Sequence, residues 1–272
     1  MASARAFRWP RLLGVAPRDP AGTAEHQGSK ADARAPGRLT SRARLTPPLA
    51  IILVAVMFFP LQLWADYDIF WHLSNGRLMT RDGVFPSPDR FSWSAAGSEV
   101  ELNSVQIDRA FYVLWDQWGP VALAIASALL YGAALLPFSL LIGRLGLRVW
   151  AEAAALIVLA ITLLPYTGAR PHLVGTVLLG VLVLVLERPF GLAKGLAAGA
   201  TLGLWVNLHG SFLIGFVLLG SAAIIWFWLR DRVSTAYAAL ALVIGAAAPL
   251  ASPYGFDLWK MPFRVSSHPL LA

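Results

Sequence analysis

The sequence predicts an all-α protein: a polytopic bundle of about seven transmembrane helices with a long first extracytoplasmic loop. Hydrophobic residues make up 57% of the 272 residues and charged residues 14%, whereas soluble domains carry roughly 25% charged residues. The mean hydropathy is +0.63. Several apolar runs approach the ~20 residues that cross a hydrocarbon core.

Residues 1–45 are expected to form a disordered basic tail in the cytoplasm, and residues 46–272 a membrane domain. The tail is rich in Ala, Pro, Gly and Arg and shows no apolar periodicity. It holds nine Arg and Lys against three Asp and Glu, which explains much of the net charge of +7. The charge therefore does not indicate a nucleic-acid partner. The tail and the apolar run after it are both too long for a cleaved signal peptide.

The apolar runs predict the spans in order. The first lies at about Thr46–Ala65, and the polar loop 66–118 follows it. Six further spans are expected at about Gly119–Ile142, Val149–Pro165, His172–Leu186, Gly195–Leu208, Ser211–Leu229 and Ser234–Ser252.

Polar, basic or turn-forming residues end each of these runs. The boundaries are Gly143-Arg144, the turn Tyr166–Pro171, Glu187-Arg188 with the linker Phe190–Lys194, His209-Gly210, Arg230-Asp231-Arg232, and the tail Pro253–Ala272. If the spans alternate, the basic ends fall on the side of the N-terminal tail, which marks that side as cytoplasmic. Loop 66–118 and the turns at Arg170 and His209 then face the other side.

Asp66, Asp68 and His72 follow the first span directly, in the segment ADYDIFWH. Asp68 and His72 share a face if this stretch is helical, and Asp66 and Asp68 share one if it is extended. Either pair could help to hold a divalent cation, Mg²⁺ or Mn²⁺, through oxygen and imidazole ligands. A carboxylate here could instead act as general base on an acceptor hydroxyl. Alternatively, the two Asp only cap a helix that starts near Ile69.

Arg170 and His172 lie in a turn, TGARPH, between two apolar runs. Arginines near the ends of membrane helices are usually cytoplasmic, so an arginine on the extracytoplasmic side is unusual. A lipid phosphate would stabilise it by bidentate hydrogen bonding. Alternatively, it extends to solvent or headgroups.

Asn207 and His209 lie in WVNLHGS, where two apolar runs meet almost without a loop. Polar residues at that depth usually face the bundle interior or a cavity. For Asn207 the alternative is a hydrogen bond between helices. Tyr254 and Trp259, after the last run, are expected to be interfacial anchors.

The rest of loop 66–118 is turn-rich, and Arg77–Trp93 is expected to be an ordered loop with a short amphipathic piece on the membrane. Its later carboxylates, Glu99, Glu101 and Asp108, are expected on a solvated face. The four polar clusters share one side of the membrane and carry complementary charges, so we expect them to form one site.

These motifs resemble, in order and spacing, those of bacterial polytopic membrane proteins grouped with the C-type (GT-C) glycosyltransferases. The patterns are D-x-D-x-(W/F)-W-H-L-x-x-G, G-x-x-P-x-x-D-x-F-S, an Arg-Pro turn, W-x-N-L-H-G-(S/G)-F and (N/S)-P-Y-G. The matching residues are Asp66, Asp68, Trp71, His72, Leu73, Gly76, Gly83, Pro86, Asp89, Phe91, Ser92, Arg170, Pro171, Trp205, Asn207, His209, Gly210, Phe212, Pro253, Tyr254 and Gly255.

The resemblance implies a glycosyltransferase of the bacterial inner membrane. It would move a sugar from a polyprenyl-phosphate donor to an extracytoplasmic acceptor, with membrane lipids around it. Asp66 or Asp68 would be the catalytic acid or base. The predicted substrate-binding residues are His72, Arg170, His172, Asn207, His209 and Tyr254. Among them, Arg170 with His72 or His209 would stabilise the phosphate leaving group.

The chain departs from the family pattern at two points. Ser104 stands where relatives have a Glu, so Glu101 or Asp108 would have to substitute. Relatives also continue with more membrane helices, so the resemblance implies an N-terminal portion whose missing helices a partner chain would supply. The alternative functions are a non-catalytic assembly subunit and a lipid or solute transporter. Apart from Glu152, the spans are nearly free of acids and bases, which counts against ion-coupled transport.

Overall fold

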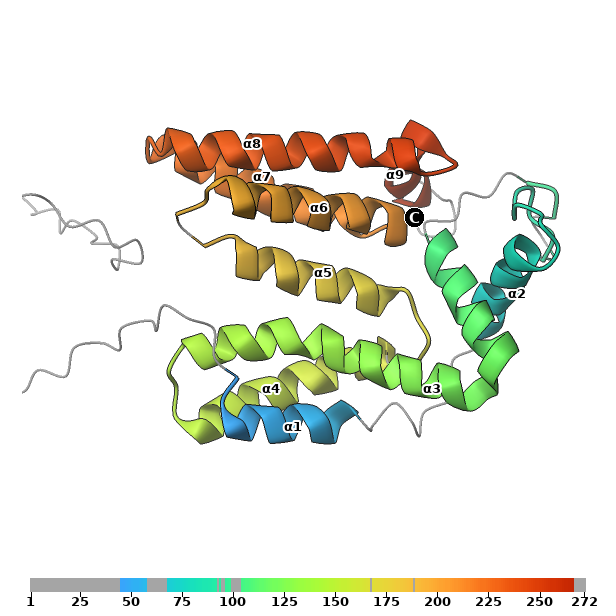
Figure 1. Cartoon of the computed structure of the whole chain (residues 1–272), viewed down its shortest axis with the longest axis horizontal. Coiled ribbons are helices and arrows are strands. Elements are labelled where there is room, and N and C mark those ends of the chain that lie inside the picture. Colours follow the sequence, from blue (N-terminus) through green and yellow to red (C-terminus); the bar gives the residue numbers. More distant parts are fainter. Residues whose placement is uncertain are drawn as a thin grey trace, which may run out of the picture. The chain divides into compact units, whose positions relative to one another are not determined.

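The computed structural model describes residues 45–57, 68–91, 93, 96–98, 104–166, 168–187 and 189–266. Every regular element in this part of the chain is a helix, so the predicted all-α class is confirmed. The helices are α1 Pro47–Met57, α2 Asp68–Thr80, α3 Val105–Arg144, α4 Val149–Leu163, α5 His172–Val185, α6 Leu192–Leu208, α7 Phe212–Trp228, α8 Arg232–Ala247 and α9 Met261–Ser266, with 3-10 turns η2 Leu164–Tyr166, η3 Ala248–Ala251 and η4 Gly255–Trp259 (Figure 1).

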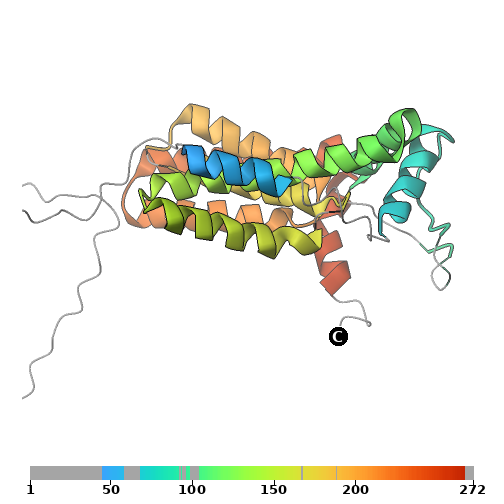
Figure 2. The same cartoon turned by 90° about the horizontal axis from the view of Figure 1, so that it is seen from below.

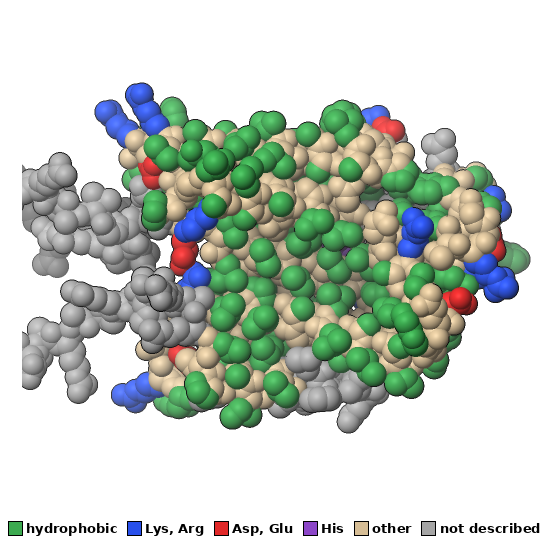
Figure 3. Space-filling model, viewed as in Figure 1, with side chains coloured by type: hydrophobic (Ala, Val, Ile, Leu, Met, Phe, Trp, Pro, Cys, Tyr) green, Lys and Arg blue, Asp and Glu red, His purple; other side chains and the backbone are tan. Residues whose placement is uncertain are grey.

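Three of the described helical segments are long and apolar enough to cross a membrane: Val105–Arg144, Val149–Tyr166 and Arg232–Ala251. Helices α5 and α7 are apolar but shorter. On the face drawn in Figure 3, hydrophobic side chains cover the middle, and charged side chains gather toward the two ends. This distribution is expected of helices that lie in a bilayer, and it suggests a membrane protein.

The long helix α3 is kinked at Gly119, where the backbone leaves the helical region (φ 72°, ψ −171°). Glycine adopts this conformation without steric cost, and Pro120 suits the first turn of the helical part that follows. The predicted start of the second span coincides with the kink. The segment before it, residues 105–118, belongs to the predicted polar loop and is helical as well.

The prediction of the linker Phe190–Lys194 is wrong in its second half, because α6 already begins at Leu192. The Lys194 ammonium donates to the backbone carbonyl of Glu187 at 2.9 Å, which joins this first turn to the end of α5. Phe190 is buried and packs against Trp226 of α7, with ring centroids 4.9 Å apart. For the first span, α1 accounts for Pro47–Met57, and residues 58–65 lie outside the described residues.

Helices α6 and α8 lie side by side, and glycines at four-residue spacing line their contact (Figure 1). A Cβ added at Gly195, Gly199 or Gly203 would lie 3.0 to 3.2 Å from atoms of α8 and η3. Small residues at this spacing let the backbones of membrane helices approach closely. The α6–α8 pair is part of a core formed by α5 to α8 around Leu202 and Trp205.

Helix α2 packs against the first part of α3 in both views (Figures 1 and 2). Ile69 and Leu73 of α2 join Phe111 and Tyr112 of α3 in a buried cluster. The two backbones nearly touch at Gly76, where an added Cβ would lie 2.2 Å from the carbonyl oxygen of Asp108. This close approach sets the position of every side chain that α2 presents.

The Gly76→Ala variant is expected to lose about 1 to 3 kcal/mol of stability, because its methyl group would overlap a backbone atom that cannot give way. Thermal unfolding of the purified full chain in detergent measures the effect. Gly220→Ala is the matched control, since a Cβ at that position in α7 meets nothing within 4 Å. Equal melting temperatures for the two variants would contradict the close approach.

Candidate functional site

A cavity of about 370 Å³ lies where several helix ends meet. Its lining comes from α2, from the residue before α3, from the start of α5, from the turn between α6 and α7, and from α9. The lining residues are His72, Ser104, Pro171, His172, His209, Gly210, Met261 and Pro262. The fold therefore brings together three histidines that are far apart in the sequence and that the sequence predicts as site residues.

His72 is oriented by a buried carboxylate. Its Nδ1 lies 2.8 Å from Oδ1 of Asp108, and the exposed fractions of the two side chains are 15% and 0%. Because an ionised carboxylate only accepts, Nδ1 carries the proton and donates it, which leaves Nε2 of the neutral ring as an acceptor. The pair thus has the arrangement of a general base held in one tautomer by a carboxylate.

The prediction that Asp108 lies on a solvated face is wrong, since its side chain is fully buried. The physical reason is the close packing of α2 on α3 at Gly76, which covers the first turn of α3. The other carboxylate oxygen, Oδ2, has no hydrogen-bond partner among the described residues. Ser104 lines the cavity one helical turn before Asp108. Asp108 is thus a carboxylate close to the position where the family pattern has its Glu, while Glu101 lies outside the described residues.

A chain of hydrogen bonds orients His209. The indole N–H of Trp205 donates to Oγ of Ser211 at 3.0 Å, and the Ser211 hydroxyl lies 2.7 Å from Nδ1 of His209. The backbone N–H of Ser211 also donates to that nitrogen, at 3.2 Å. Nδ1 is therefore an acceptor, and the neutral ring carries its proton on Nε2.

The pKa of His209 is lowered to about 4, mainly by burial, with smaller contributions in the same direction from the neighbouring His172 and His72. His209 is thus neutral near pH 7 and offers an N–H donor rather than a positive charge. The ring of His172 lies 4.8 Å from that of His209 and stacks on Tyr166 at 5.6 Å. A Cβ at Gly175, on the same helix as His172, would lie 2.7 Å from Ser211 Oγ. A glycine at this position therefore leaves room for the network.

Arg170 and Asp68 form an ion pair, with 3.2 Å between Nη2 and Oδ2. Their side chains are 26% and 62% exposed. Asp68 begins α2 one turn before His72, close to the helix start that the capping alternative predicts. Arg170 directly precedes Pro171, which lines the cavity. Two of the predicted clusters therefore meet here, and Arg170 contacts a carboxylate rather than solvent alone.

The predicted cation site, Asp66 with Asp68 and His72, stays a prediction because Asp66 lies outside the described residues. Of its two described members, Asp68 pairs with Arg170 and His72 pairs with Asp108. Within the described part of the chain, no group of three His, Asp or Glu side chains is arranged to hold a metal ion.

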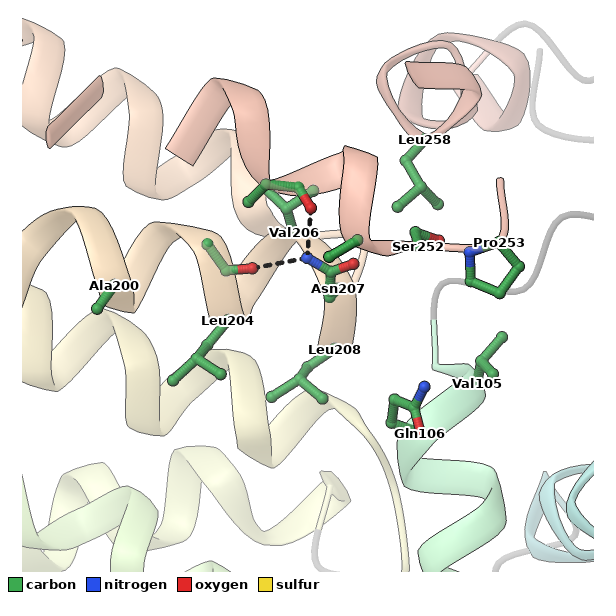
Figure 4. A pocket seen from close by; sticks show the side chains of 13 residues that line it. Val105, Gln106, Ala200, Leu204, Val206, Asn207, Leu208, Ser252, Pro253 and Leu258 are labelled. Atoms are coloured by element: carbon green, nitrogen blue, oxygen red, sulfur yellow. Dashed lines mark hydrogen bonds between the residues drawn. The ribbon is translucent and has the colours of Figure 1, made fainter. Parts of the chain in front are cut away.

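Asn207 lines a second cavity, of about 520 Å³ and mostly apolar (Figure 4). It is not among the residues that line the histidine cavity. Its Nδ2 donates to the backbone carbonyls of Gly203 at 2.9 Å and Ala248 at 3.1 Å. The alternative of a hydrogen bond between helical segments is confirmed. Tyr254 packs edge-on against Phe85 at 5.1 Å. Trp259 donates its indole N–H to the Ala246 carbonyl and packs on core residues, and its role as an interfacial anchor stays a prediction.

The site therefore offers three chemical functions: a proton acceptor at His72, a neutral N–H donor at His209, and a positive charge at Arg170. Sequence reasoning did not predict that Asp108, Ser211 and Trp205 support the histidines. It gave Asp108 a role only as a substitute for the Glu of the family pattern, and Trp205 only as a match to a motif. Ser211 and Trp205 belong to the motif WVNLHGS, so the HGS turn offered a signal. For the bond from Asp108 to His72, 36 residues away, the sequence carries no local signal.

The lowered pKa of His209 predicts a loss of stability as pH falls. Between pH 6.5 and about 4 the unfolded chain binds a proton here and the folded chain does not, so acid favours unfolding. The lowered pKa of His209 accounts for about 3 kcal/mol of the free energy of unfolding at most. Unfolding of the full chain between pH 7 and 4 should show a shallower pH dependence in His209→Gln than in the parent. Identical dependences would contradict the assignment.

Comparison with known proteins adds no family to this description. The chain matches no family model, and it matches no curated protein and no solved structure. The function of the chain is therefore inferred from its own cavity and helices.

Proposed function

We propose that this chain is a glycosyltransferase of the bacterial inner membrane, which moves a sugar from a polyprenyl-phosphate donor to an extracytoplasmic acceptor hydroxyl. One observation carries the proposal: His72, which Asp108 orients, lines a single cavity with the N–H donor His209, and the Arg170 ion pair lies beside it. A base and anion-stabilising groups together are what transfer from a phosphate leaving group requires.

The proposed topology has seven spans, with the N-terminal tail in the cytoplasm. The residues after the first span, the starts of α5 and α7 and the end of α8 then share the extracytoplasmic side. The histidine cavity draws its lining from the first three of these. Basic residues mark the other side. Arg144 pairs there with Glu187, and Arg230 and Arg232 lie at the start of α8. The distribution of charge supports this orientation.

In the proposed reaction, His72 Nε2 takes the proton of the acceptor hydroxyl, and Asp108 stabilises the imidazolium that forms. The acceptor oxygen attacks the anomeric carbon, and the bond from that carbon to the phosphate oxygen breaks. Arg170 and the His209 N–H stabilise the negative charge that develops on the phosphate. In this scheme Asp68 positions Arg170 through their ion pair. The prediction of Asp66 or Asp68 as the catalytic carboxylate remains untested beside it.

The second cavity supports a lipid-linked donor, because it adjoins the first at three places in the chain. Ser104 lines the histidine cavity and Val105 the apolar one. Likewise, His209 and Met261 line the histidine cavity, whereas Leu208 and Leu258 line the apolar one. A polar cavity beside an apolar one suits a phosphate with a hydrocarbon chain. A bound Mg²⁺ or Mn²⁺ would neutralise phosphate charge, with Asp66, Asp68 and His72 as its predicted ligands.

Asp108→Asn is expected to lower the transfer rate by about a hundredfold or more, because the amide can no longer stabilise a protonated His72. The measurement is transfer of labelled sugar in membranes that contain the full chain, with a panel of polyprenyl-phosphate monosaccharides as donors. Asp116→Asn is the matched control: the residue lies on the same helix, is exposed and binds Tyr112.

Membrane abundance of both variants is measured in the same preparations, so that loss of protein is not mistaken for loss of activity. An assembly subunit would show no transfer in the parent chain with any donor. That result, or equal rates for the Asp108 and Asp116 variants, would contradict the proposal.

A further inference from the structure

A second polar site lies beyond the end of α7, the end opposite the His209 turn. A groove of about 640 Å³ runs between the last residues of α7 and the first turns of α8. Arg230 and Arg232 line it, together with Phe227, Trp228 and Thr235. None of these residues takes part in the proposed transfer reaction.

The two arginines of the groove are available to a ligand. Neither guanidinium forms an ion pair or a hydrogen bond with another described residue. The carboxylate between them, Asp231, caps α8: Oδ1 accepts from the Ser234 backbone N–H at 3.1 Å, and Oδ2 accepts from the Ser234 hydroxyl at 2.8 Å. Two adjacent arginines favour an anionic ligand, and guanidinium groups match phosphate oxygens bidentately.

The rest of the groove favours a ligand with an apolar part. Phe227 and Trp228, which line it, are 69% and 79% exposed. The segment that begins at Arg232 is one of those long and apolar enough to cross a membrane. The groove therefore opens at the end of a candidate span, where aromatic rings and lipid phosphates are found in membranes.

We propose that this groove binds an anionic phospholipid of the surrounding bilayer. Arg230 and Arg232 hold its phosphate, and its acyl chains run along Phe227 and Trp228. The volume is within the range of small-molecule sites, and basic pockets at the ends of membrane helices suit anionic headgroups. A zwitterionic phospholipid carries the same phosphate without the net charge, so it binds more weakly.

The backbone conformation of Arg230 allows a substitution that removes the side chain without straining the backbone. Its φ is 58°, in the left-handed region, and the N–H of Asp231 donates to the Trp226 carbonyl at 2.9 Å to close the end of α7. Glycine is the residue that this helix-end position favours. Arg230→Gly thus removes the guanidinium and leaves a backbone at least as stable as before.

The test uses the purified full chain in a neutral detergent, with dioleoyl phosphatidylglycerol or dioleoyl phosphatidylcholine added and bound lipid counted by native mass spectrometry. The parent is expected to retain phosphatidylglycerol about tenfold or more over phosphatidylcholine. Arg230→Gly with Arg232→Gln should abolish that preference. Arg148→Gln should keep it, because this exposed arginine lies before α4 and outside the groove.

Three results would overturn the proposal. The double variant could keep the preference, or Arg148→Gln could lose it equally, which would indicate non-specific attraction. Displacement of phosphatidylglycerol by an excess of inorganic phosphate would assign the groove to free phosphate instead. The melting temperature of Arg230→Gly, expected at or above that of the parent, separates lost binding from lost folding.

Discussion

The arrangement of the histidine cavity depends on the burial of one carboxylate, that of Asp108. A fully buried charge is costly unless it is paired, and Asp108 is paired with His72 on the neighbouring helix. The bond forms because Gly76 lets α2 approach the backbone of α3. The same contact fixes the tautomer of His72 and leaves its acceptor nitrogen for a substrate. The groups that dock α2 on α3 therefore also set the chemistry of the cavity.

The other two histidines owe their positions to short turns between helices. Pro171 and His172 begin α5, and His209 ends α6 in an extended conformation before Gly210 and the start of α7. Turns this short leave little freedom, so these residues lie at helix ends on the side of the fold where α2 packs. The hydrogen-bond chain from Trp205 through Ser211 then selects the donor face of His209. The cavity thus combines an imidazole that presents an acceptor nitrogen, that of His72, with an imidazole that presents an N–H donor, that of His209.

The helices and the polar turns could be predicted from the sequence, because apolar runs and their interruptions are local signals. The kink at Gly119 and the starts of α4 and α5 coincide with the starts of predicted spans. The partner of His72 could not be predicted, since a contact over 36 residues depends on how α2 packs. Asn207 was predicted in the same cluster as His209, yet it lines the second cavity. Asn207 lies on the last turn of α6 and bonds the Gly203 and Ala248 carbonyls. His209 follows the helix in an extended conformation, so helical periodicity does not bring the two side chains to one side.

The two proposed sites lie at opposite ends of α7, whose 17 residues span about 25 Å at 1.5 Å per residue. At that separation, substitutions are expected to act additively unless a packed element transmits strain between them. Helix α8 could be such an element, because it begins at the arginine groove and packs on the glycines of α6. It continues into η3, where the Ala248 carbonyl accepts a hydrogen bond from Asn207, two residues before His209. A double-mutant cycle between Arg230→Gly and Asp108→Asn separates the two cases. Additive effects on transfer would make the phospholipid a structural ligand, whereas a coupling term would make α8 the route by which bilayer composition influences the histidine cavity.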